Sequence, residues 1–135
     1  MEISMNTKTI FRKTVMAGAV CGTALFGAPL MSQADTAPLS HEADPGVYEV
    51  IAEDEYLRVV IGTWKPGQRD KAHSHPIFAA YSLTDCHRRI YKADGTVDEK
   101  QLKAGSTRVF GAVASHSFEN IGKSECRNLL IERKK

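Results

Sequence analysis

The sequence predicts an all-β domain, an antiparallel sandwich or barrel, on two observations. After residue 46 the chain contains about nine short runs rich in β-branched and aromatic residues, separated at nearly regular spacing by turn residues. No stretch in the same part has a convincing helical period. We also find no internal repeat of fixed period, so one domain is the economical interpretation.

The individual strands follow from alternation and from the turn residues between them. In the run 56–64, apolar side chains alternate with a period of two, which indicates a half-buried strand. Pro66 and Gly67 predict a turn in which Gly67 takes a positive φ, and Asp94-Gly95 is typical of a hairpin tip. The other predicted strands are 47–51, 77–83, 86–91, 96–102, 106–110 and 126–132.

The first 34 residues have the three parts of a secretory signal peptide. Lys8, Arg12 and Lys13 form the positive region, the uncharged run 14–31 forms the apolar region, and a small-x-small cleavage site ends at Ala34. The alternative is a membrane anchor, but a spanning helix needs about 20 strongly apolar residues and this run is diluted by glycine, alanine and proline. We therefore predict a signal peptide and a periplasmic or secreted location.

Removal of residues 1–34 leaves about 100 residues, which suits one compact domain. We predict a flexible N-terminal arm over 35–46, where apolar periodicity is weak, and a barrel domain over 47–135. The leader carries three basic side chains and one acidic one, so 15 of each sign remain of the 18 and 16 in the whole chain. This balance gives no electrostatic reason to expect nucleic acid as a partner.

Two histidines two residues apart form the main chemical signal. In an extended strand residues i and i+2 share a face, so His73 and His75 would project together, and His116 follows another run with strand character. Neutral imidazole suits zinc, copper, iron and nickel, and three protein ligands with an open position are typical of a reactive metal site. The alternative is a chance or hydrogen-bonded surface pair in a chain with five histidines.

Two cysteines, Cys86 and Cys126, lie outside the leader. In an oxidising compartment two thiols of a small domain more often pair than stay free. The alternative is two buried, reduced cysteines that pack as small apolar side chains.

Two motifs stand about forty residues apart in the chain. The first is Pro66-Gly67-x5-His73-x-His75, and the second contains Gly105 and His116-x3-Asn120. Together they resemble the two signature motifs of the cupin superfamily, in particular of small single-domain cupins of the cupin-2 type. The resemblance extends from about Tyr48 to the C-terminus, and the strand spacing fits as well. It implies a cupin-like double-stranded β-helix, the jelly-roll barrel, and one divalent metal ion (zinc, iron, manganese or nickel) held by His73, His75 and His116.

The chain departs from the family pattern where the resemblance predicts a fourth ligand. The first motif usually continues with a glutamate, but Ala79 and Ala80 stand at its place. Gly111 and Val113 replace the proline and glycine of the second motif. Three neutral imidazoles leave the charge of a bound ion unneutralised by protein, which leaves room for water, an anionic ligand or a substrate carboxylate. The same loss could mean that the metal is weakly bound or absent.

Two neighbouring polar residues, Tyr81 and Glu119, could substitute for the missing ligand, although neither stands at the family's ligand position. Tyr81 shares the alternating face of Ala79, so its hydroxyl could reach the cavity, but a core aromatic is the preferred interpretation. Glu119 is interpreted as a surface carboxylate, and Asn120 has a structural or a functional hydrogen-bonding role. Four aromatic residues are expected in the core or the cavity wall: Trp64, Phe78, Phe110 and Phe118.

The jelly-roll order implied by the resemblance places the last strand antiparallel beside the strand after the histidine pair. The end of one then meets the start of the other, so we predict a disulfide between Cys86 and Cys126.

The resemblance implies a small-molecule pocket around the metal and a homodimer formed through sheet edges. If the protein is an enzyme, the reaction would be dioxygenation, isomerisation or lyase chemistry on a small oxygenated acid, although no general base stands out. The alternative is a non-catalytic module that binds or senses a small molecule, with or without metal, because one fold hosts both classes. A third, weaker hypothesis is an interaction protein in which the motifs are relics.

Overall fold

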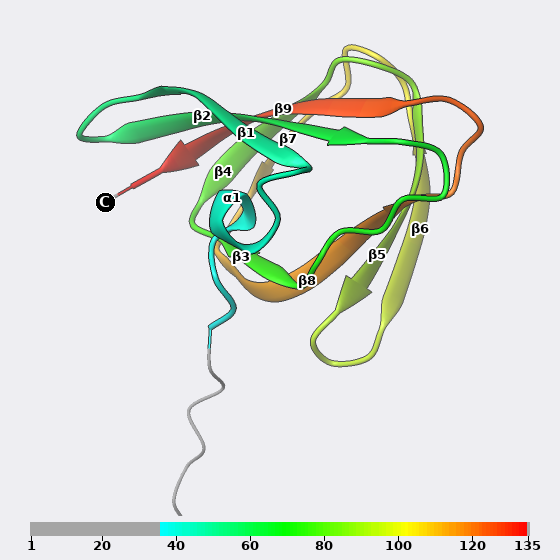
Figure 1. Cartoon of the computed structure of the whole chain (residues 1–135), viewed down its shortest axis with the longest axis horizontal. Coiled ribbons are helices and arrows are strands. Elements are labelled where there is room, and N and C mark those ends of the chain that lie inside the picture. Colours follow the sequence, from blue (N-terminus) through cyan, green and yellow to red (C-terminus); the bar gives the residue numbers. More distant parts are fainter. Residues whose placement is uncertain (1–35, 135) are drawn as a thin grey trace, which may run out of the picture. The chain divides into compact units, whose positions relative to one another are not determined.

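The computed structural model describes residues 36–134. The predicted signal peptide over 1–34 lies outside these residues and stays a prediction. Within the described part, no helix has the length and apolar character needed to cross a membrane. This part folds as one helix and nine strands (Figure 1). Every strand pairs antiparallel with at least one other strand. The prediction of an all-β jelly roll is confirmed.

The strands form two facing sheets. The five-stranded sheet has the order β1-β2-β9-β4-β7, and the four-stranded sheet has the order β3-β8-β5-β6. The predicted neighbours are present, since the last strand pairs antiparallel with the strand after the histidine pair. The elements are α1 (Ser40–Ala43), β1 (Tyr48–Glu53), β2 (Leu57–Trp64), β3 (His73–His75), β4 (Phe78–Ser82), β5 (Cys86–Lys92), β6 (Val97–Leu102), β7 (Thr107–Phe110), β8 (Val113–Asn120) and β9 (Cys126–Arg133).

The core lies between the inner faces of the two sheets and is built around Trp64 at the end of β2. Its indole stacks on Phe118 of the opposite sheet with ring centroids 4.1 Å apart. Gly62, two residues earlier on the same face, leaves space for the ring, because a Cβ there would lie 2.4 Å from Trp64 Cη2. The turn after this strand also follows the sequence, since Gly67 has φ of 77°.

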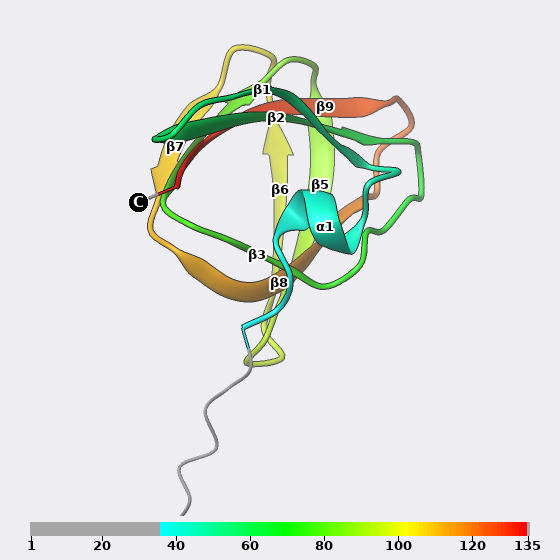
Figure 2. The ribbon, with the colours of Figure 1, turned by 60° about the vertical axis from the view of Figure 1, so that its left-hand side comes forward.

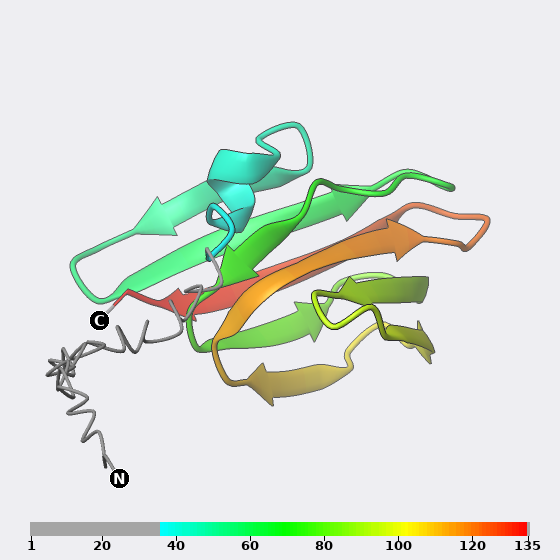
Figure 3. The same ribbon diagram turned by 90° about the horizontal axis from the view of Figure 1, so that it is seen from below.

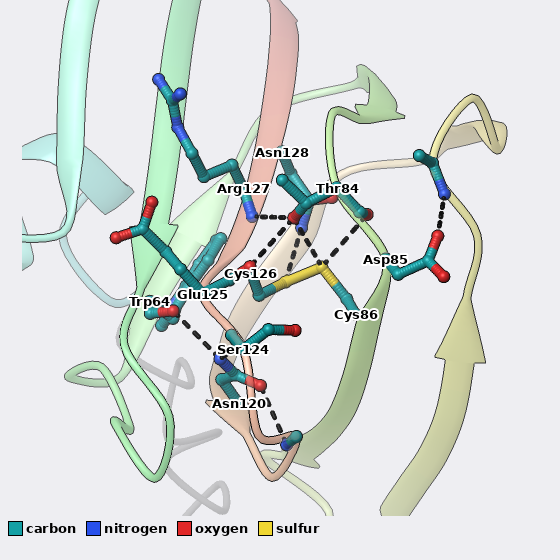
Figure 4. Close-up of a disulfide and its surroundings, with 12 residues drawn as sticks. Trp64, Thr84, Asp85, Cys86, Asn120, Ser124, Glu125, Cys126, Arg127 and Asn128 are labelled. Carbon is teal, nitrogen blue, oxygen red and sulfur yellow. Dashed lines mark hydrogen bonds between the residues drawn. A yellow bond between two sulfur atoms is a disulfide. The ribbon is translucent and has the colours of Figure 1, made fainter.

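A disulfide between Cys86 and Cys126 joins the first residue of β5 to the first residue of β9 (Figure 4). Because β5 and β9 belong to different sheets, this bond holds the sheets together at one end. Thr84 closes the same corner, since its hydroxyl donates to the Glu125 carbonyl at 3.1 Å and accepts from Arg127 N at 2.8 Å. The predicted pairing is present.

The chain before β1 has regular structure where we expected a flexible arm. Over the described residues 36–46 it forms α1, which lies between β1 and β3 at one end of the barrel (Figures 2 and 3). Two backbone hydrogen bonds hold it there: Ala37 N to Ala114 O at 3.1 Å, and Ser74 N to Pro38 O at 2.8 Å. These bonds are non-local, so weak local periodicity did not reveal them.

Apolar side chains gather on the outer face of the five-stranded sheet. Val109 is 77% exposed, and Ile131 and Tyr81 are also exposed on neighbouring strands. Contiguous exposed apolar surface often marks a contact surface. The predicted homodimer stays a prediction.

Candidate metal centre

The structure brings together the three histidines that the sequence singled out. His73 and His75 lie on β3, and His116 lies on the neighbouring strand β8, directly opposite His73. One ring nitrogen from each histidine lies within 4.8 Å of the others. Two histidines that are two residues apart on a short strand, and one histidine on its partner strand, therefore bring their ring nitrogens close together.

Acceptors on the outer side of the site fix the tautomers of the two β3 histidines. His73 Nδ1 lies 2.8 Å from the carbonyl oxygen of Lys71, which can only accept, so Nδ1 carries the proton. His75 Nδ1 likewise donates to Glu132 Oε1 at 2.7 Å. In the neutral form of either ring the lone pair is therefore on Nε2, the inward-facing nitrogen.

These Nε2 atoms lie 3.0 Å apart, although neither neutral ring has a proton to share there. Two facing lone pairs at this distance repel unless a cation, either a metal ion or a proton, lies between them. His116 Nε2 is buried and has no hydrogen-bond partner among the described residues. The three nitrogens thus need an electron-pair acceptor, and their donor set fits a divalent metal ion.

Burial favours the neutral form of His73 and His116, which is the form that binds metal. Burial lowers the pKa of His73 to about 4. Burial, followed by the neighbouring His73 and His75, lowers the pKa of His116 to about 3. At neutral pH both rings therefore keep their lone pairs, and a metal ion meets little competition from protons.

A buried tyrosine and aspartate support the site from the side of β1. The Tyr48 hydroxyl lies 3.0 Å from His73 Nε2 and donates to Asp70 Oδ2 at 2.8 Å. Asp70 also accepts from Trp64 Nε1 at 2.9 Å and from Phe118 N at 2.7 Å. Burial raises the pKa of Asp70 to about 6, and burial followed by the Asp70 charge raises the pKa of Tyr48 well above its usual value. Tyr48 is therefore a protonated phenol at neutral pH, with its oxygen beside the histidines.

Glu132 supplies a carboxylate that the sequence did not lead us to expect. It is completely buried, and its second oxygen lies 3.6 Å from the Arg58 guanidinium. It reaches the site from β9, in register with Phe78 on β4. The site thus has no carboxylate at the family's ligand position, but it has one behind His75 that fixes the ring and compensates part of a bound ion's charge.

We expect Glu132→Gln to lower the affinity for a divalent metal by about 10- to 100-fold, the usual effect of losing such a partner. Glutamine keeps the size but removes the negative charge, and its amide can donate to the ring, so the tautomer is no longer fixed. Competition with a chromophoric chelator would measure the change. Glu119→Gln is the matched control and should leave the affinity unchanged. Equal affinities of wild type and Glu132→Gln would contradict the role of this carboxylate.

The two candidate substitutes for the missing glutamate, Tyr81 and Glu119, lie outside the histidine cluster, and Asn120 has a separate role. Tyr81 is 43% exposed on the outer face of β4, so it is neither a core aromatic nor close to the cavity. Glu119 is partly buried and accepts from the Tyr91 hydroxyl at 2.5 Å. Asn120 is fully buried, and its amide donates to the carbonyls of Trp64 and Ser124, which makes its role structural (Figure 4).

A cavity of about 290 Å³ lies between the sheets and reaches the metal centre at His116 and Tyr48. The four aromatic residues assigned to the core or cavity wall all line it: Trp64, Phe78, Phe110 and Phe118.

Sequence reasoning missed Tyr48, Asp70 and Glu132. A usable signal existed for Glu132, because alternation along the last strand places it on the inward face with Cys126 and Leu130. A charged residue on a buried face calls for a partner. Nothing local marked Tyr48 or Asp70.

Comparisons with known proteins identify the fold through similar solved structures. No family model matches the chain, and no curated protein matches it in sequence. A cupin domain from Bordetella pertussis Tohama I is similar in structure, with a TM-score of 0.61 at 20% identity over 66% of this chain and 93% of that one. A cupin superfamily protein from Desulfitobacterium hafniense has a TM-score of 0.51 at 12% identity over 66% and 77%.

A polyketide cyclase from Streptomyces resistomycificus is also similar, with a TM-score of 0.52 at 13% identity over 65% of this chain and 64% of that one. These likenesses show that the chain has the cupin fold. On this fold, the three histidines form a cluster that could hold a metal ion.

Proposed function

We propose that this protein is a small cupin that binds one divalent metal ion through His73, His75 and His116 and takes a small molecule into the adjoining cavity. The observation that carries the proposal is the distance of 3.0 Å between the Nε2 atoms of His73 and His75. The contacts of each ring place its proton on Nδ1, so the two Nε2 atoms face each other with lone pairs. The unpartnered Nε2 of His116 supports it. Zinc, iron and nickel suit three imidazole nitrogens, and manganese is a further candidate because the resemblance to cupins implies it.

A bound ion would act as a Lewis acid or would activate oxygen. The chain's own residues would orient the ligand rings, exclude water from the buried side and hold the Tyr48 proton toward Asp70. With these parts, the proposed reaction is dioxygenation, isomerisation or lyase chemistry on a small oxygenated acid. The alternative is a non-catalytic module, since the described residues at the site include no free carboxylate placed as a general base.

We also propose that the protein works in the periplasm or outside the cell. The disulfide supports this location because such bonds persist in oxidising compartments. The leader-like composition of the first 34 residues points the same way.

Elemental analysis of protein purified without a His tag tests whether the chain binds a metal ion, and which one. We expect about one ion per chain, removed by a chelator and restored by the metal alone. Iron or manganese would direct the search toward oxygen chemistry, and zinc toward Lewis-acid chemistry. A search for turnover by the metal-loaded protein then separates an enzyme from a binding module. No metal as purified, no uptake on reconstitution and full stability after chelation would contradict the proposal.

A further inference from the structure

The cavity beside the metal centre has mostly apolar walls. Phe78, Phe110, Ile90 and Leu130 line it, from both sheets. Apolar walls with a few polar groups are typical of sites for small organic ligands. The polar groups should therefore show what kind of ligand fits.

Arg88 on β5 is the most unusual of them. Its side chain lines the cavity although the residue is only 7% exposed. One terminal nitrogen, Nη2, donates to Asp98 Oδ2 at 3.0 Å. The other, Nη1, is buried and has no hydrogen-bond partner among the described residues. A buried N–H of a charged group without an acceptor is unfavourable, so this nitrogen lacks a partner that a ligand can supply.

The charges around Arg88 favour an anion as that partner. Arg108 and Lys92 line the same cavity, and the only carboxylate among the lining residues is Asp98. Asp98 lies at the solvent side, with 48% of its side chain exposed. Burial lowers the pKa of Arg88; the hydrogen bond and charge of Asp98 oppose this, and the positive charge of Arg108 adds to the lowering. A ligand with a negative charge would relieve this concentration of positive charge.

We propose that the cavity binds an organic carboxylate, whose carboxyl group accepts from Arg88 Nη1 and whose apolar body packs on Phe78, Phe110 and Ile90. The planar edge of a guanidinium matches a carboxylate, and the walls match a carbon body that an inorganic anion lacks. The role of the cavity as a ligand site rests on the proposed function. The preference for a carboxylate rests on Arg88 and the charged residues around it, not on the histidines, so it can be tested without metal.

The test uses benzoate as the probe and benzamide as its neutral analogue, with the metal-free full chain at pH 7. Isothermal titration calorimetry should show benzoate binding at least about 10-fold more tightly than benzamide, acetate or inorganic phosphate, in line with a charged hydrogen bond plus an apolar contact. Trp64 is the single tryptophan and lines the cavity, so its fluorescence gives a second readout. No binding of benzoate, or equal binding of benzoate and benzamide, would overturn the proposal. Phosphate binding as tight as benzoate binding would overturn it as well.

Substitutions assign the effect to one side chain. Arg88→Gln should lower benzoate affinity about 10-fold or more and leave benzamide unchanged, because it removes the charge. Arg88→Lys keeps the positive charge and so protects folding. Its benzoate affinity should lie between those of wild type and Arg88→Gln, because lysine lacks the planar edge of a guanidinium. Arg127→Gln makes the same change at an exposed arginine on β9 and should have no effect. Full benzoate affinity in a folded Arg88→Gln protein would overturn the proposal.

The metal-binding proposal and the carboxylate proposal can be contradicted separately. Metal-free His73→Ala/His75→Ala protein should keep the preference for benzoate, because Arg88 is intact. Metal uptake by wild type without benzoate binding would overturn the carboxylate proposal alone. Benzoate binding without metal uptake would contradict the metal proposal and support this one.

Discussion

Replacing His73 and His75 together with alanine is expected to abolish metal binding, because two of the three ligands are lost. Wild-type protein at a metal concentration of about 1,000 times its dissociation constant gains about 4 kcal/mol of unfolding free energy from the ion, and the variant should gain none. Urea denaturation of both proteins, with and without metal, measures this gain. Because each protein is compared with itself, with and without metal, the direct cost of truncating two buried side chains does not enter the comparison.

His87→Ala is the control for the loss of a histidine as such. His87 lies on β5, where its Nε2 pairs with Glu99 at 2.8 Å on the exposed outer side, away from the cluster. This variant should bind about one ion per chain, like wild type. One equivalent of tightly bound metal in the double histidine variant would show that the ion sits elsewhere.

Loss of the Cys86–Cys126 disulfide is expected to lower the free energy of unfolding by about 4 kcal/mol. The two cysteines are 40 residues apart in the chain, so the bond removes considerable entropy from the unfolded state. The bond also joins the two sheets, which otherwise meet mainly through side chains. The double variant Cys86→Ala/Cys126→Ala avoids placing a hydroxyl at these buried positions. Its urea midpoint should fall by about 1 M or more.

Reduction of the wild-type protein provides the matched comparison. Dithiothreitol should produce nearly the same loss, and the remaining difference reports the packing of the sulfur atoms. Two titratable thiols in unreduced protein, with unchanged mobility on non-reducing gels, would contradict the disulfide. A loss below about 1 kcal/mol on reduction would contradict the stabilising role assigned to it.

Most of the fold could be predicted from the sequence because its signals are local. The predicted run 86–91 became Cys86–Lys92, and the predicted run 96–102 became Val97–Leu102. Alternation of side chains and the turn residues between runs determine such segments, and both can be read within a short window. The histidine cluster was also predictable, because His73 and His75 share a face in any extended strand.

The partners of the histidines could not be predicted, because they depend on contacts between distant segments. Glu132 is 57 residues from His75, and Tyr48 is 25 residues from His73. Alternation shows which side chains of one strand share a face, but not which strand will lie opposite that face.

The interpretation of Tyr81 was wrong for a related reason. Alternation does place Tyr81 with Ala79, but that face of β4 is the outer one. Phe78, Ala80 and Ser82 face the cavity instead. The period of a strand was therefore clear from the sequence, whereas the choice between inner and outer face was not.

The segment before β1 has a consequence for how the mature protein could be made. The strand β3, which carries His73 and His75, is three residues long and pairs with β8 along one edge only. Its other edge is bridged by Leu39 at Ser74, so the backbone of 37–39 acts as a short supplementary strand. The proposed cleavage after Ala34 would leave two residues before Ala37, the first residue bonded to β8. Trimming the new N-terminus by a few more residues would thus expose the edge of the strand that carries His73 and His75.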